Sequence, residues 1–169
     1  MLRAIAIIVA AIAVMVAGVA PVAASNDPHR IPYPAAPFDL PADLCGFPIH
    51  VDVPFDHAAI TETILPDGTI IDKVSGGMFV TATNTANLRS ITVNGSGPGV
   101  FTIKPYGTIT GEFRGRGILW ATNLTDFGFP SDVVAAAGPL TVVQAFGSLD
   151  FESVTGSPQV ITDICAALR

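Results

Sequence analysis

From residue 47 onward the chain alternates apolar and polar residues with a period of two. Ile49, Val51 and Val53 fall on one side of this pattern, whereas His50 and Asp52 fall on the other. A pleated strand with one buried face requires this period. The pattern therefore predicts a half-buried strand whose outer face is polar.

Further strand patterns follow at spacings of about 8 to 12 residues, with turn-forming residues between them. They cover residues 59–65, 69–74, 78–83, 88–93, 100–104, 108–120, 140–146, 149–154 and 158–168, the last ending in a short turn. Residues 123–138 are expected to form an irregular connection, in which 132–137 make one helical turn. No long segment has a helical period, which excludes the α/β classes.

These patterns predict an all-β fold, mostly an antiparallel meander. A small β-barrel is preferred and a β-sandwich is the alternative. The preference rests on Gly111, Gly115 and Gly117 in the longest predicted strand, because sharply coiled strands need such points. A glycine within a strand also marks a bulge, a bend or a close backbone approach.

The first 24 residues have the pattern of a secretory signal peptide. Arg3 precedes an uncharged apolar run over residues 4–20, and Val22 and Ala24 supply the small residues that favour cleavage after Ala24. The alternative is a retained membrane anchor, because the run approaches the length that spans a bilayer. We therefore expect a secreted or cell-envelope protein, with no membrane span after cleavage.

Residues 25–44 are rich in proline, which fixes φ and removes a backbone donor. We expect a semi-rigid linker here and a single β domain over residues 45–169. The chain's two cysteines, Cys45 and Cys165, lie at opposite ends of that domain. An even pair of cysteines in an exported protein predicts a disulfide, so the bridge should join the two ends of the domain.

The exported part of the chain is acidic. Without Arg3, seven basic residues stand against 14 carboxylates, a formal charge of −7. Such a balance argues against nucleic acid or an anionic membrane as the partner. No cofactor is expected.

Three histidine and carboxylate residues form the candidate metal site: His50, Asp52 and His57. Imidazole and carboxylate groups bind zinc and other divalent metals. Their spacing matches no established zinc pattern, and polar residues on an outer strand face are the ordinary expectation.

The second candidate is a ligand site built from Arg114, Arg116, Tyr106 and Trp120. Arginines beside aromatic rings at the mouth of a barrel can hold an anionic or amphipathic ligand. The alternative is a surface ladder of ion pairs that also includes Glu112.

No catalytic constellation is evident in the sequence. Ser96 lies in a glycine-rich loop that lacks the Gly-x-Ser-x-Gly spacing of a nucleophile elbow. Asp52, Glu62, Glu112 and Glu152 are the carboxylates from which a pair could be drawn, but the sequence does not say which of them meet.

Several short motifs resemble those of a family of small secreted all-β proteins of unknown function from high-GC Gram-positive bacteria. They are Leu44-Cys45-Gly46-Phe47-Pro48, Asp67-Gly68, the stretch 95–99, Gly115-Arg116-Gly117 and Asp163-Ile164-Cys165. The resemblance implies secretion, an all-β fold and the disulfide. It assigns no catalytic residue.

Together these observations predict a secreted, non-catalytic β domain that binds a ligand or partner at the cell envelope or outside the cell. The expected partner is an apolar or amphipathic small molecule, or a component of the envelope. The alternative is a small barrel-type enzyme, an isomerase, cyclase or hydrolase, with its site inside the barrel.

Overall fold

The computed structural model describes residues 29–33, 36–105 and 107–169. The predicted signal peptide and the first residues of the predicted linker lie outside this range. No helix among the described residues is long and apolar enough to cross a membrane.

The described chain forms 14 strands, one 3-10 helix and one short α-helix. The strands are β1 (His29–Pro32), β2 (Phe38–Leu40), β3 (Ile49–Asp56), β4 (Ala59–Ile64), β5 (Ile70–Ser75), β6 (Met78–Asn84), β7 (Ser90–Asn94), β8 (Gly99–Ile103), β9 (Thr108–Phe113), β10 (Arg116–Trp120), β11 (Val133–Ala137), β12 (Leu140–Ala145), β13 (Phe151–Gly156) and β14 (Gln159–Asp163). The helices are η1 (Leu124–Phe127) and α2 (Ile164–Leu168).

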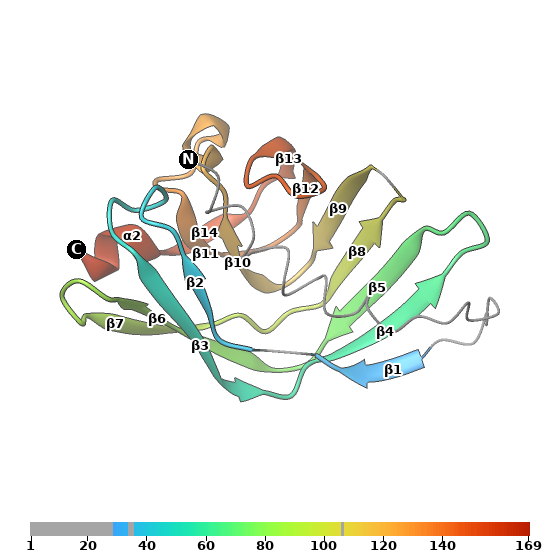
Figure 1. The fold of residues 1–169 in the computed structure, drawn as a ribbon, viewed down its shortest axis with the longest axis horizontal. Coiled ribbons are helices and arrows are strands. Elements are labelled where there is room, and N and C mark those ends of the chain that lie inside the picture. The colour runs from blue at the N-terminus through green and yellow to red at the C-terminus, as the bar shows by residue number, and fades with distance from the viewer. Residues whose placement is uncertain (1–28, 34–35, 106) are drawn as a thin grey trace, which may run out of the picture.

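Consecutive strands join in pairs across a corner, so that the chain forms seven long, bent strands: β1–β2, β3–β4, β5–β6, β7–β8, β9–β10, β11–β12 and β13–β14 (Figure 1). One half of every long strand lies in sheet A, whose order is β1-β4-β5-β8-β9-β12-β13. The other halves form sheet B, β2-β3-β6-β7, and sheet C, β10-β11-β14. All strand pairs are antiparallel and join long strands that are neighbours in the chain, which confirms the all-β antiparallel meander.

The preferred barrel is corrected by the structure, because none of the three sheets is closed. Sheet A ends at the unpaired edges of β1 and β13, and sheets B and C separate between β7 and β10. Instead of closing, sheets B and C bury side chains between them, and α2 packs against β7 and β11. The structure therefore has no barrel interior that could contain the expected site.

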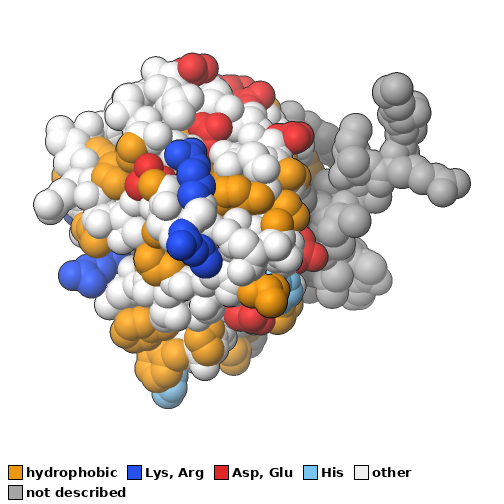
Figure 2. All heavy atoms as spheres, turned by 90° about the vertical axis from the view of Figure 1, so that its left-hand side faces the viewer, with side chains coloured by type: hydrophobic (Ala, Val, Ile, Leu, Met, Phe, Trp, Pro, Cys, Tyr) orange, Lys and Arg blue, Asp and Glu red, His pale blue; other side chains and the backbone are white. Residues whose placement is uncertain are grey.

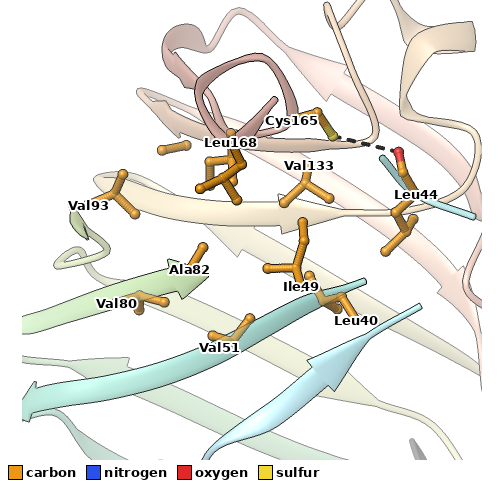
Figure 3. Close-up of a cluster of buried hydrophobic side chains, with 12 residues drawn as sticks. Leu40, Leu44, Ile49, Val51, Val80, Ala82, Val93, Val133, Cys165 and Leu168 are labelled. Atoms are coloured by element: carbon orange, nitrogen blue, oxygen red, sulfur yellow. Dashed lines mark hydrogen bonds between the residues drawn. The ribbon is translucent and has the colours of Figure 1, made fainter. Parts of the chain in front are cut away.

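The first core cluster lies between sheets B and C (Figure 3). Ile49 and Val51 of β3 are buried in it, whereas His50 and Asp52 lie half-exposed on the outer face of sheet B. The predicted alternation is therefore confirmed. Ile164 and Leu168 of α2 complete the cluster.

Strand β11 occupies the stretch in which we expected a helical turn. Val133 and Ala135 face the first core cluster, whereas Val134 and Ala136 face a second cluster shared with β12 and β13. A strand buried on both faces has a continuous apolar run, and periodicity alone does not separate such a run from a buried helical segment. The helical turn was therefore wrong.

The disulfide is confirmed, with the Cα atoms of Cys45 and Cys165 5.2 Å apart. Cys45 follows β2, and Cys165 lies in α2 after the last strand. The Asp163 side chain caps α2 by accepting a hydrogen bond from the Ala166 backbone amide at 2.9 Å. The bridge thus joins the two ends of a meander whose first and last strands do not pair.

The proline-rich lead-in contributes two strands, both at sheet edges. β1 borders sheet A and β2 borders sheet B, positions where a missing backbone donor is tolerated. Leu40 and Leu44 are only 3% and 4% exposed and belong to the first core cluster. This part of the segment therefore belongs to the sheets, where the sequence predicted a linker.

Candidate functional site

The outer face of sheet B brings His50 together with two carboxylates. Its Nδ1 lies 2.7 Å from Asp39 Oδ1, and its Nε2 lies 3.5 Å from Asp52 Oδ2. The hydrogen bond to Asp39 raises the pKa of His50 above its usual value, and Asp52 adds to the effect. A carboxylate beside each ring nitrogen stabilises the protonated form of the imidazole.

His57, the third predicted metal ligand, lies elsewhere. Its ring stacks on Phe55 with centroids 4.5 Å apart, and Phe55 in turn meets Phe79 at 5.7 Å. Phe55 and Phe79 are 44% and 40% exposed. The corner after β3 lies at the lower end of the molecule, where Figure 2 shows hydrophobic side chains and a histidine gathered together. No group of three or more histidine, cysteine or acidic side chains suited to a metal occurs in the described part of the chain.

The residues of the predicted arginine site lie in different parts of the structure. Arg114 lies in the corner between β9 and β10, Arg116 begins β10, and both side chains are exposed. Trp120 is half-buried against the first core cluster, and its ring lies 5.5 Å from that of Phe38. Tyr106 lies outside the described residues. The described members therefore do not converge on one pocket.

A different feature emerges from the pairing of sheet A. Because directly paired residues share a face, the register places one predominantly apolar set on the same side of β4, β5, β8, β9 and β12. We call this side the apolar face. Its members are Ile60, Glu62, Ile64, Ile70, Asp72, Val74, Gly99, Phe101, Ile103, Ile109, Gly111, Phe113, Leu140, Val142 and Gln144.

Core residues cover one part of the apolar face and leave another part uncovered. Leu140 and Val142 are buried in the second core cluster, against which Phe113 also packs. In contrast, Ile70, Phe101 and the other members on β4, β5 and β8 belong to neither core cluster of the described residues. Most of them are half-buried, and Ile64 is 39% exposed. The part of the face over β4, β5 and β8 is thus apolar surface that these clusters leave free.

Two carboxylates interrupt this apolar surface. Glu62 of β4 and Asp72 of β5 are direct register partners, and the partner of Asp72 on β8 is Phe101. Directly opposed side chains have Cβ atoms about 4.5 to 5.5 Å apart, so the two carboxylates are close neighbours. Like charges in this position destabilise a sheet.

The environment of Asp72 is unfavourable for its charge. Burial, followed by the charge of Glu62, raises the pKa of Asp72 to about 6. Its Oδ1 atom is buried and has no hydrogen-bond partner among the described residues. Burial also raises the pKa of the nearby Tyr33 phenol, and the charges of Asp56 and Asp72 add to that effect. Carboxylates with perturbed pKa values in apolar surroundings are typical of functional sites.

Sequence reasoning noted Glu62 as a possible member of a carboxylate pair but missed Asp72 and Tyr33. The position of Asp72 opposite Glu62 could have been found by counting residues from the predicted hairpin turn. Residues 66–68 form the predicted hairpin turn, in which the Leu65 amide donates to the Thr69 carbonyl at 2.8 Å. Counting outward from that turn pairs residue 62 with residue 72.

A small apolar hollow lies where β9, β10, β11 and β12 meet. Its volume is about 10 Å³, room for no more than about one water molecule. It is lined by Phe113, Gly115, Gly117, Leu119, Ala136, Ala137, Gly138, Leu140 and Pro158. This hollow is too small for an organic ligand, which leaves the apolar face as the stronger candidate.

No family model, curated protein or solved structure matches this chain. The resemblance to small secreted proteins therefore stays a prediction, and the candidate site rests on the geometry of the chain itself.

Proposed function

We propose that this protein is an exported, non-catalytic binding domain that holds an apolar or amphipathic molecule against the apolar face of sheet A. The observation that carries the proposal is the half-buried apolar surface over β4, β5 and β8, which joins neither described core cluster. Contiguous apolar surface of this kind marks ligand or partner sites in soluble proteins. The disulfide, which is typical of proteins that work outside the reducing cytosol, supports the location.

Phe101 is the side chain through which the proposal can be tested. It projects from β8 at the centre of the apolar face, opposite Asp72 on one side and Gly111 on the other. A Cβ on Gly111 would lie 3.4 Å from the Phe101 ring and 3.1 Å from the Phe113 ring. Glycine at this position therefore leaves room for the rings of both phenylalanines.

The experiment titrates the exported protein with N-phenyl-1-naphthylamine, an uncharged apolar probe whose fluorescence rises in apolar surroundings. Phe101→Ala should weaken binding about tenfold, because burying the area of one aromatic contact contributes about 1 to 2 kcal/mol of binding free energy. Val100→Ala is the matched control, because Val100 is the preceding residue of the same strand and faces the other side. It should change the affinity less than twofold. Absence of probe binding, or equal losses in the two variants, would overturn the proposal.

Mass spectrometry provides a second arm of the test. Protein recovered from its native source under non-denaturing conditions should carry a small molecule, and Phe101→Ala should reduce its occupancy. A ligand that persists in the variant at unchanged occupancy would place binding away from the apolar face.

A further inference from the structure

We infer that the apolar face selects a cationic amphiphile, whose positively charged nitrogen binds between Glu62 and Asp72 while its apolar part lies along Phe101 and the neighbouring isoleucines. This inference rests on the proposed function and names the ligand class of the same site. It is argued from the charge complementarity of two carboxylates set in an apolar surface.

The two carboxylates lack a described positive partner. Lys73 is adjacent to Asp72 in β5 and therefore faces the opposite side of the sheet. The ion pairs formed between described side chains involve His50 alone and lie on sheet B. On β1 the backbone register places His29 opposite Glu62, whereas the neighbours of Asp72 on β5 and β8 are apolar.

The unpaired carboxylate oxygen of Asp72 is a second argument for a cationic ligand. A buried carboxylate oxygen without a donor is uncommon in folded proteins and costs free energy. An ammonium group offers up to three N–H donors together with the positive charge that relieves the repulsion between the carboxylates. An anionic head group would add a third negative charge at the same place, and a neutral apolar molecule would leave the oxygen unpaired.

The apolar surroundings of the two carboxylates favour an amphiphile over a simple metal ion as the ligand. Calcium and magnesium take six or more oxygen ligands, and the described residues offer no cluster of three acidic, histidine or cysteine side chains. Ile60, Ile64, Ile70 and Val74 flank the carboxylates along β4 and β5. Aliphatic side chains on both sides of a charge pair suit a molecule that carries an apolar chain beside its charge.

The test uses isothermal titration at pH 7.5 with three molecules of equal chain length: decylamine, decanol and decanoate. The cationic amine should bind at least tenfold more tightly than the alcohol, and decanoate should bind most weakly. Asp72→Asn and Glu62→Gln should each remove most of the preference for the amine while leaving the affinity for decanol within about twofold.

Glu112→Gln is the matched control. Glu112 lies on β9 with its side chain exposed, paired with Val100 and Thr141 on the opposite face of sheet A. This variant removes the same unit of charge from the protein and should retain the tenfold preference. Loss of the preference in Glu112→Gln would show a general effect of net charge and overturn the inference.

The remaining outcomes separate the two proposals. If none of the three molecules binds, the proposed function fails together with the inference. If all three bind with similar affinity, or decanoate binds best, the apolar face is a binding site but the cationic selectivity is wrong. Calcium chloride added in place of the amine should give no heat of binding. Tight calcium binding would overturn the inference, because the site would then be a metal site.

Discussion

Gly97 and Gly115 lie back to back at the corner where sheets B and C part. A Cβ atom on Gly115 would lie 2.6 Å from the Cα of Gly97, and one on Gly97 would lie 2.6 Å from the backbone nitrogen of Arg116. Two backbone hydrogen bonds cross the same corner, from Arg114 to Pro98 at 3.1 Å and from Arg116 to Ser96 at 3.2 Å. The two long strands approach this closely only because neither carries a side chain there.

Replacing Gly115 by alanine should destabilise the protein by about 1 to 3 kcal/mol, the usual cost of forcing extra atoms into packed structure. The obstructing atoms are backbone atoms and a proline ring, which cannot move aside cheaply. Urea unfolding followed by tryptophan fluorescence measures the change. Gly117→Ala is the control, because its Cβ would meet Phe113 at an ordinary 3.6 Å. Equal losses in both variants would contradict the close approach.

Removal of the disulfide should lower the free energy of unfolding substantially. The bridge joins residues separated by 120 positions, and the chain-entropy model assigns about 4 to 5 kcal/mol to such a loop. The double variant Cys45→Ser, Cys165→Ser measures the loss by urea unfolding. Intact oxidised protein should also weigh two hydrogens less than the reduced form. Finding two free thiols in protein purified without a reducing agent would contradict the bridge.

Asp72→Asn should stabilise the protein at pH 7. The pKa of Asp72 is about 6 in the folded state, above that of an unperturbed aspartate, so the folded state binds its proton more strongly than the unfolded state does. Its ionised form is therefore disfavoured on folding, and stability falls as pH rises from about 4 to 6. Since the side chain is partly solvated, the gain should be about 1 kcal/mol.

Thermal unfolding between pH 4.5 and 7.5 measures this dependence. The wild-type protein should lose stability relative to Asp72→Asn across that range, while Glu62, Tyr33 and Asp56, the described groups that interact with the site, remain present in both. A variant that is more stable but has lost its preference for amines would show that Asp72 is retained at a cost to stability. A difference that does not depend on pH would contradict the assignment.

His50 should titrate above its usual pKa of about 6.5. The hydrogen bond to Asp39 is the main cause, so Asp39→Asn should lower the pKa of His50. The interaction favours the folded state below about pH 6.5 and is lost as pH rises through the folded pKa. NMR titration of the imidazole protons measures both values. Asp132→Asn is a distant control, because Asp132 instead accepts a hydrogen bond from the Thr125 amide.

Local patterns predicted most of the strands because each depends on neighbours in the sequence. The alternation around His50 gave β3 its buried and exposed faces, and Asp67-Gly68 gave the β4–β5 turn, in which Gly68 has a φ of +83°. The same reasoning failed for β11, where four successive buried residues pack on two faces. Burial on the second face depends on sheet A, which no local pattern reveals.

The candidate site was less accessible to sequence reasoning. The apolar face is assembled from five strands, and its register follows from pairings such as Asp72 with Phe101 that span separate hairpins. The predicted metal residues are divided because β3 continues past Pro54 to Asp56, which leaves His57 beyond the end of the strand. There His57 stacks on Phe55, whereas Asp39 reaches His50 from the lead-in that sequence reasoning set aside as a linker.

The order of the long strands has a consequence for how the protein is made. Each strand pairs with the one before it, so pairing can proceed in step as the chain becomes available from its N-terminal end. Cys165 lies beyond the seventh long strand, so oxidation can fasten the two ends only after every hairpin has been delivered. The disulfide then reports that every strand is in place, and a thiol-reactive label would distinguish incomplete chains from finished molecules.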